Sequence, residues 1–181
     1  MIATPQTALQ PRTLAEFQVW ESQDGFKYEW NDGELIQFTG MNKTQLYIYD
    51  TLNKLFIAKG YWQKGALVTE QDVILSGIQL KRPDIAFFTN EQIQLAKSGE
   101  DEIPEFVVEV ISGTDNINHV EKKVTEYFNA GVKIVWNIFP ELQLIYVYSS
   151  RKNVKICSDI DVCSAEPILP DFKISVNEIF A

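Results

Sequence analysis

Cysteine and histidine are scarce in this sequence, and their scarcity limits the chemistry open to it. Among 181 residues there are two cysteines, Cys157 and Cys163, and a single histidine, His119. A structural zinc site needs several Cys or His ligands at characteristic spacing, and this set does not supply them. Two cysteines in one short stretch do not make a disulfide framework, so we expect a reduced, cytoplasmic protein.

Long apolar runs are also missing. No run approaches the ~18 residues that span a bilayer, and residues 1–12 lack the basic and apolar regions of a signal peptide. Because these twelve residues contain two prolines and show no periodicity, we predict a flexible N-terminal arm. No linker or repeat interrupts the rest of the chain, which predicts a single domain over residues 13–181 and no contact with a membrane.

Positive charge is in short supply. Sixteen Lys and Arg residues stand against twenty-five Asp and Glu residues, which gives a net charge of −9. A protein that binds nucleic acid by neutralising phosphates usually presents a basic face. The composition therefore argues against tight nonspecific DNA binding, although a local basic groove is compatible with it.

Two segments carry the signals of long helices. The first begins at Asn42, a favourable N-cap residue, and extends to about Lys59 before Gly60. Its predicted buried stripe comprises Leu46, Tyr49, Leu52, Leu55 and Phe56. The second extends over residues 116–130 and ends at Gly131, a residue suited to a helix C-terminus.

Strand signals lie between and after these helices. Residues 27–38 form a predicted hairpin, because Asn31-Asp32-Gly33 suits the positive φ angles of a tight turn. A short, strongly apolar strand is predicted at 83–88, and the apolar run at 106–111, broken only by Glu109, predicts a strand that is buried on both faces. The predicted fold class is α/β (α+β), with a mixed central sheet flanked by helices.

A carboxylate interrupts one of the two apolar runs. Glu109 lies within Phe106-Val107-Val108-Glu109-Val110-Ile111. Burying its charge costs on the order of several kcal/mol unless the carboxylate is paired or bound to a cation. An open strand end or a structural salt bridge would account for Glu109 equally well. Asp84 begins the other apolar strand, and two neighbouring acids with oxygen ligands suit Mg²⁺ or Mn²⁺.

A lysine on the second helix completes the candidate site. The helical wheel places Lys123 at the border of the apolar stripe, beside Tyr127, whereas Lys122 falls nearly opposite in solvent. Lys123 is therefore the lysine able to reach the carboxylates. A snorkelling lysine at a helix edge is the alternative interpretation.

The order and spacing of these motifs resemble the Uma-two family, a domain of unknown function that is abundant in cyanobacteria. The matching segments are Asp32-Gly33-Glu34-Leu35, Arg82-Pro83-Asp84-Ile85, Pro104 to Ser112, Lys123 with Tyr127 and Ala130-Gly131-Val132, and Ile168 to Phe172 with Ile179-Phe180. The resemblance extends from about Thr13 to the C-terminus. It implies a restriction-endonuclease-like fold of the PD-(D/E)xK nuclease superfamily.

What the resemblance implies about function is a Mg²⁺-dependent endodeoxyribonuclease that hydrolyses phosphodiester bonds of DNA, acting as a homodimer. Asp84 and Glu109 would bind Mg²⁺ (or Mn²⁺). Position 111, where the superfamily lysine stands, is Ile111, so that role would pass to Lys123. Glu34 would be an accessory acid, although a surface residue beside the turn is an equally good interpretation.

Three positions depart from the family pattern. Asn42 stands where members commonly carry a histidine, Ser112-Gly113-Thr114 replaces Ser-Pro-Ser, and His119 replaces an aspartate four residues before the helix lysine. These departures leave two alternatives open. One is a catalytically inactive nuclease-fold protein that acts as a binding or interaction module. The other is a structural dimeric protein in which Lys123 satisfies Glu109 without metal in a closed, dry site.

Overall fold

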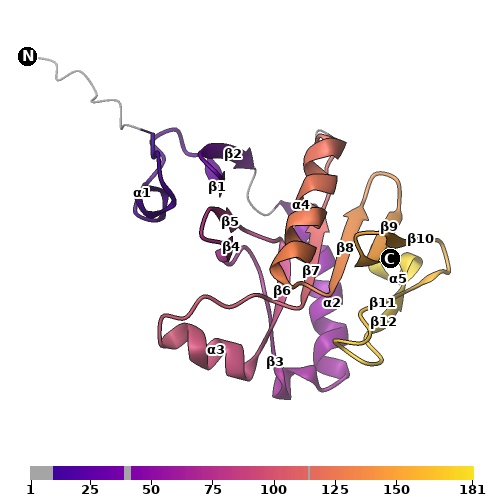
Figure 1. The fold of residues 1–181 in the computed structure, drawn as a ribbon. Coiled ribbons are helices and arrows are strands. Elements are labelled where there is room, and N and C mark those ends of the chain that lie inside the picture. Colours follow the sequence, from indigo (N-terminus) through magenta and orange to yellow (C-terminus); the bar gives the residue numbers. More distant parts are fainter. Residues whose placement is uncertain (1–9, 39–41, 114) are drawn as a thin grey trace, which may run out of the picture.

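A six-stranded sheet forms the centre of the molecule in the computed structural model, which describes residues 10–38, 42–113 and 115–181 (Figure 1). Its strand order is β10-β9-β8-β7-β6-β3. The strands are β3 (Gly65–Val68), β6 (Ile85–Thr89), β7 (Phe106–Val110), β8 (Ile134–Phe139), β9 (Leu144–Ser150) and β10 (Asn153–Ser158). β7 and β8 pair in parallel, whereas the other neighbours pair antiparallel, so the sheet is mixed.

Helices cover both faces of this sheet, which explains why its central strands are almost entirely apolar. Helix α4 (Ile117–Ala130) connects β7 to β8 and packs Val124 and Tyr127 on the face that carries Val107 and Val135. Helix α2 (Lys43–Ala58) packs Ile48, Leu52 and Phe56 on the opposite face, together with α5 (Val176–Phe180) and the small sheet of β11 (Val162–Ser164) and β12 (Lys173–Ser175).

A second sheet lies beside the first and carries the predicted hairpin. Its order is β2-β1-β5-β4, formed by β1 (Lys27–Asn31), β2 (Glu34–Phe38), β4 (Val73–Ser76) and β5 (Gln79–Lys81). The β1–β2 turn uses positive φ at Asp32 (48°) and Gly33 (88°), as the turn sequence predicts. Helix α1 (Leu14–Gln18) packs Phe17 against Trp30 and Leu80 of this hairpin sheet.

Two short helices complete the fold. The 3₁₀-helix η1 (Tyr61–Gln63) leads from α2 into β3, and α3 (Asn90–Lys97) follows β6 after a capping box at Thr89. The prediction of a mixed sheet flanked by helices is confirmed. Residues 1–9 of the predicted arm lie outside the described residues. Among the helices that the structure describes, none has the length and apolar character needed to cross a membrane.

Candidate active site

Asp84 and Glu109 lie side by side on the α4 face of the central sheet. Ile85 pairs with Val108 in the antiparallel β6–β7 register, and one further step along both strands sets Asp84 opposite Glu109. Asp84 is half-buried, and its Oδ2 accepts a hydrogen bond from the Val110 backbone N–H at 2.6 Å. Its Oδ1 accepts from Gln45 Nε2 of helix α2 at 2.8 Å. Asp84 is thus held by two neighbouring elements.

Helix α4 supplies two partners to Glu109. The helix begins after Asn116, whose side chain accepts from the Asn118 N–H, and it buries Val120, Val124 and Tyr127. The Tyr127 hydroxyl donates to Glu109 Oε1 at 2.5 Å, and Lys123 Nζ lies 3.1 Å from Glu109 Oε2. Glu109 is only 7% exposed, so these two donors compensate a buried carboxylate.

A third carboxylate reaches the same lysine from the hairpin sheet. Glu29 on β1 is 4% exposed, and its Oε1 accepts from Lys123 Nζ at 2.8 Å and from the Arg82 backbone N–H at 2.8 Å. Lys81 Nζ lies 3.8 Å from Glu29 Oε2 and 3.1 Å from Glu126 Oε2 of α4. Lys123 therefore contacts one carboxylate from each sheet, Glu29 of the hairpin sheet and Glu109 of the central sheet.

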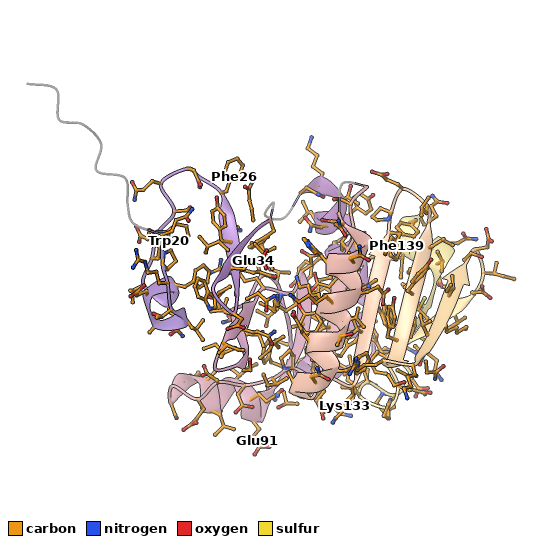
Figure 2. All side chains as sticks on the ribbon, turned by 45° about the horizontal axis from the view of Figure 1, so that its top comes forward. Trp20, Phe26, Glu34, Glu91, Lys133 and Phe139 are labelled. Atoms are coloured by element: carbon orange, nitrogen blue, oxygen red, sulfur yellow. The ribbon has the colours of Figure 1, made fainter. Side chains whose placement is uncertain are left out.

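These groups line a cavity of about 350 Å³ between the hairpin sheet, helix α4 and the central sheet. Six carboxylates and four Lys or Arg side chains line it among the described residues, which leaves an excess of two negative charges. Glu34, Asn42 and His119 are exposed residues that line the same cavity. Figure 2 places Glu34 on the hairpin, between the region marked by Trp20 and helix α4.

Burial and mutual repulsion shift the titration of the acids. Burial, together with the charges of Asp84 and Glu29, raises the pKa of Glu109 to about 8, against the attraction of Lys123 and the hydrogen bond from Tyr127. Burial also raises the pKa of Asp84 above its ordinary value. Burial lowers the pKa of Lys123, but Glu109 and Glu29 outweigh that effect and raise it above its usual range. Lys123 therefore stays charged, and a further cation would stabilise the charged forms of Asp84 and Glu109.

Comparisons with known proteins show the family and the fold of this chain. A family model described as "Putative restriction endonuclease" matches residues 14–177. The chain belongs to the Uma2 family. Among solved structures, a protein from Anabaena variabilis described as "a putative nuclease belonging to DUF820" superposes with a TM-score of 0.75. The match has 20% identity and covers 94% of this chain and 98% of that chain, so it shows a common fold.

A weaker structural match is the type IIG restriction endonuclease BpuSI, with a TM-score of 0.42 and 13% identity. It covers 79% of this chain but only 16% of that much longer chain. No similar sequence was found among curated proteins. The Uma-two resemblance that the motifs predicted is confirmed by the family match, and the Anabaena structure confirms the fold.

The structure brings together three of the four residues that the sequence singled out in this Uma2 chain. Glu109 and Lys123 are in direct contact, and Asp84 lies opposite Glu109 and lines the same cavity. Lys122, in contrast, is 57% exposed and lies 3.9 Å from Glu126. Glu34 lines the same cavity but is exposed at the start of β2. The position of Thr114 lies outside the described residues.

Three contributors were not anticipated. The sequence predicts no role in the site for Tyr127, which belongs to the apolar stripe and to the family motif, or for Glu29, which belongs to the hairpin. Gln45 was missed because the predicted stripe of α2 was partly wrong: Leu46 is 56% exposed, and the buried positions are Gln45, Ile48, Leu52 and Phe56. The sequence signal for this residue was the spacing of Gln45 and Ile48, which are three places apart and therefore lie on the same face of helix α2.

The carboxylates of Asp84 and Glu109 suit a hard divalent cation whose other ligands would be water and substrate oxygens. Within the described residues, no group of three or more His, Cys, Asp or Glu side chains has the spacing of a complete metal site. Mg²⁺, however, usually takes one or two protein carboxylates and fills its other positions with water and phosphate oxygens. Asp84 and Glu109 are two such carboxylates, and burial, which raises the pKa of each, disfavours their charged forms when no further cation is near.

Proposed function

We propose that this Uma2 protein is a Mg²⁺-dependent nuclease that hydrolyses phosphodiester bonds in DNA. The observation that carries the proposal is the convergence of Asp84, Glu109 and Lys123 in one cavity from three different elements. The family description, which names restriction endonucleases, supports the nuclease class. The negative excess of the cavity supports a cation as part of the working site.

Asp84 and Glu109 would hold the ion, Mg²⁺ or Mn²⁺. When bound there, it would polarise the scissile phosphate and stabilise the leaving oxygen. Tyr127 fixes one oxygen of Glu109, and the Val110 N–H and Gln45 fix Asp84, so both carboxylates are oriented before substrate arrives. Such pre-organisation avoids the cost of reorienting the acids during the reaction.

Lys123 would position the attacking water and offset charge that develops on the phosphate. Its ammonium group has three donors, and Glu29 and Glu109 accept two of them. The third donor is available for a water molecule or a phosphate oxygen in the cavity. Glu34, from the opposite wall, would be an accessory acid that contacts hydrated substrate groups.

Two further parts of the proposal concern the setting. A homodimer would let paired subunits cut the two strands of a duplex, and sedimentation velocity of the protein with duplex DNA tests that state. A cytoplasmic location is supported by Cys157 and Cys163, which are both free thiols in the structure.

One observation favours a second candidate function, a nuclease-fold protein without catalysis that acts as a binding module. Lys123 already neutralises Glu109 at 3.1 Å, as a purely structural ion pair would. The net charge of −9 also opposes the approach of a DNA backbone. Against a closed structural site stands the cavity itself, which Lys123 and both acids line.

Cleavage of supercoiled plasmid distinguishes the two functions. The nuclease proposal expects nicking by the wild type with Mg²⁺, no nicking in EDTA, and loss by about a hundredfold or more in Asp84→Ala and Glu109→Ala, since each removes a residue of the proposed reaction centre. Absence of nicking in the wild type with plasmid, linear duplex and single-stranded DNA, in Mg²⁺ and in Mn²⁺, would leave the binding module as the better account.

A further inference from the structure

Asn137 is a buried polar residue next to Glu109 that the proposed chemistry does not use. It lies on β8, and the parallel β7–β8 register pairs it directly with Glu109. Residues paired in this way point to the same face of a sheet, which here is the α4 face. Asp84, Glu109 and Asn137 thus form a row across three neighbouring strands.

The side chain of Asn137 is fully buried, and it makes no hydrogen bond of normal geometry with any of the described residues. It is 0% exposed, and neither its Oδ1 nor its Nδ2 makes a hydrogen bond within the described residues. The Tyr148 hydroxyl is the nearest candidate partner: a contact with the Asn137 amide lowers the pKa of Tyr148, but this contact lacks the geometry of a normal hydrogen bond, and the hydroxyl donates to Glu121 Oε1 at 2.6 Å. Buried amides that lack protein partners are uncommon, and such groups are usually satisfied by ordered water.

The place to which Asn137 is directed is the cavity of the candidate site. Asn137 lines that cavity together with Glu109, Val124 and Tyr127, beneath helix α4. An apolar residue would suit this position equally well if packing alone mattered, because Val135, two places earlier on the same face of β8, is buried with Val124 and Tyr127 of α4. Asparagine differs from leucine at this position in that it can form hydrogen bonds with a polar ligand at the floor of the cavity.

We propose that Asn137 is a positioning residue that holds a water molecule against Glu109 at the floor of the cavity. The amide offers two donors on Nδ2 and an acceptor on Oδ1, so it can bind a water whatever orientation that water needs. The water would give Glu109 a further hydrogen-bond partner besides Tyr127 and Lys123 and would limit rotation of its carboxylate. This role rests on the proposed function, because the orientation of the Glu109 carboxylate affects metal binding only if Glu109 holds a cation.

The first test is a crystal structure of the metal-free wild type at a resolution that shows ordered water. The proposal expects a water within hydrogen-bond distance of Asn137 and of a Glu109 carboxylate oxygen, and it expects that water to be lost in Asn137→Leu. A wild-type site in which Asn137 contacts only protein atoms would overturn the proposal. This readout is independent of cleavage and of metal.

The second test compares metal affinity with stability in the same variants. Outer partners of ligating groups typically change affinity by about 10–100-fold when removed, so Asn137→Leu should weaken Mn²⁺ binding at least tenfold by calorimetry. Its thermal midpoint should stay close to that of the wild type, because a buried amide and its water are replaced together by an apolar side chain of similar volume. Unchanged Mn²⁺ affinity in Asn137→Leu would show that Asn137 has no positioning role.

Two further variants keep this comparison decisive. Asn137→Ser introduces a hydroxyl and leaves room for water. Its Mn²⁺ affinity should therefore stay within about threefold of wild type, well short of the loss expected when an outer partner is removed. An affinity as weak as that of Asn137→Leu would contradict the proposed water. Tyr146→Phe, at the next position of the same row in the β8–β9 register, is the matched control and should bind as wild type does. If the wild type binds no Mn²⁺ either alone or with a DNA duplex, the metal proposal fails, and the crystallographic test still decides the role of Asn137.

Discussion

The ammonium group of Lys123 is shared between two carboxylates from different sheets, and this sharing defines the site at the scale of single residues. Glu109 belongs to the central sheet and Glu29 to the hairpin sheet. Glu29 also accepts the Arg82 N–H, so its carboxylate is fixed by backbone as well as by side chains. Lys123 is therefore held in place by a residue that is not a proposed ligand of the cation.

Substitution of Glu29 tests this division of roles. Glu29→Gln keeps the shape but removes the charge that anchors Lys123, so we expect cleavage to fall by about 10–100-fold, as for loss of an orienting partner. Mn²⁺ affinity should change little, because Asp84 and Glu109 are intact. Cleavage kinetics and calorimetry on the same protein measure both quantities. A loss of metal affinity as large as the loss of rate would instead make Glu29 a ligand.

Glu109 gives the metal-free protein a specific dependence of stability on pH. Its pKa is about 8 in the folded protein and 4.5 as an ordinary glutamate. Between these values the folded state binds more protons than the unfolded state, so the contribution of Glu109 to stability is present below pH 4.5 and is lost as pH rises through 8.

Urea unfolding of wild type and Glu109→Gln in EDTA measures this effect. Glutamine cannot ionise, so the variant should gain stability relative to wild type as pH rises from about 5 to about 8. A stability difference that is the same at both ends of this range would contradict the raised pKa of Glu109.

At the scale of elements, buried Lys81 connects the hairpin sheet to helix α4. Lys81 ends strand β5, is 2% exposed, and lies between Glu126 of α4 and Glu29 of β1. Because the same Glu29 contacts Lys123, the packing of β5 against α4 also sets the distance between the two walls of the cavity. The hairpin sheet is thus part of the site as well as its neighbour.

Replacing Lys81 by methionine should therefore destabilise the protein strongly. The change keeps the volume but leaves Glu29 and Glu126 buried with less positive charge, and removal of one partner of a buried pair typically costs about 3–5 kcal/mol. The free energy of urea unfolding is the measurement. Lys122→Met, on the exposed side of the same Glu126, is the control and should change stability by less than about 0.5 kcal/mol. Equal stabilities of the two variants would contradict the role assigned to Lys81.

Local signals in the sequence predict those parts of the fold and site that depend on neighbours along the chain. The turn at Asp32-Gly33, the helix ends at Asn42 and Gly131, and the choice of Lys123 over Lys122 all follow from such signals. Glu29 could not be found in this way, because its partners Arg82 and Lys123 are distant in sequence and come together only when the two sheets pack. Asn137 is hidden for the same reason.

At the scale of the whole molecule, the negative charge of the protein opposes the approach of DNA. The net charge is −9, and the cavity itself carries more carboxylates than cations. A cation held by Asp84 and Glu109 would reverse the local sign where the scissile phosphate must come. Binding of DNA should then depend on the divalent ion more than on a basic surface, in contrast to proteins whose affinity comes from phosphate neutralisation by many Lys and Arg residues.

The adjacent lysines Lys122 and Lys123 allow the most direct test of the central claim. They follow one another on α4, but only Lys123 reaches the two acids, while Lys122 is exposed. With Mg²⁺ and a DNA duplex, the cleavage rate of Lys123→Ala should fall by about a hundredfold or more, as expected for a group that stabilises charge in the transition state. The rate of Lys122→Ala should stay close to that of the wild type. Equal rates in the two variants, or no cleavage by the wild type, would contradict the assignment of this cavity as a nuclease site.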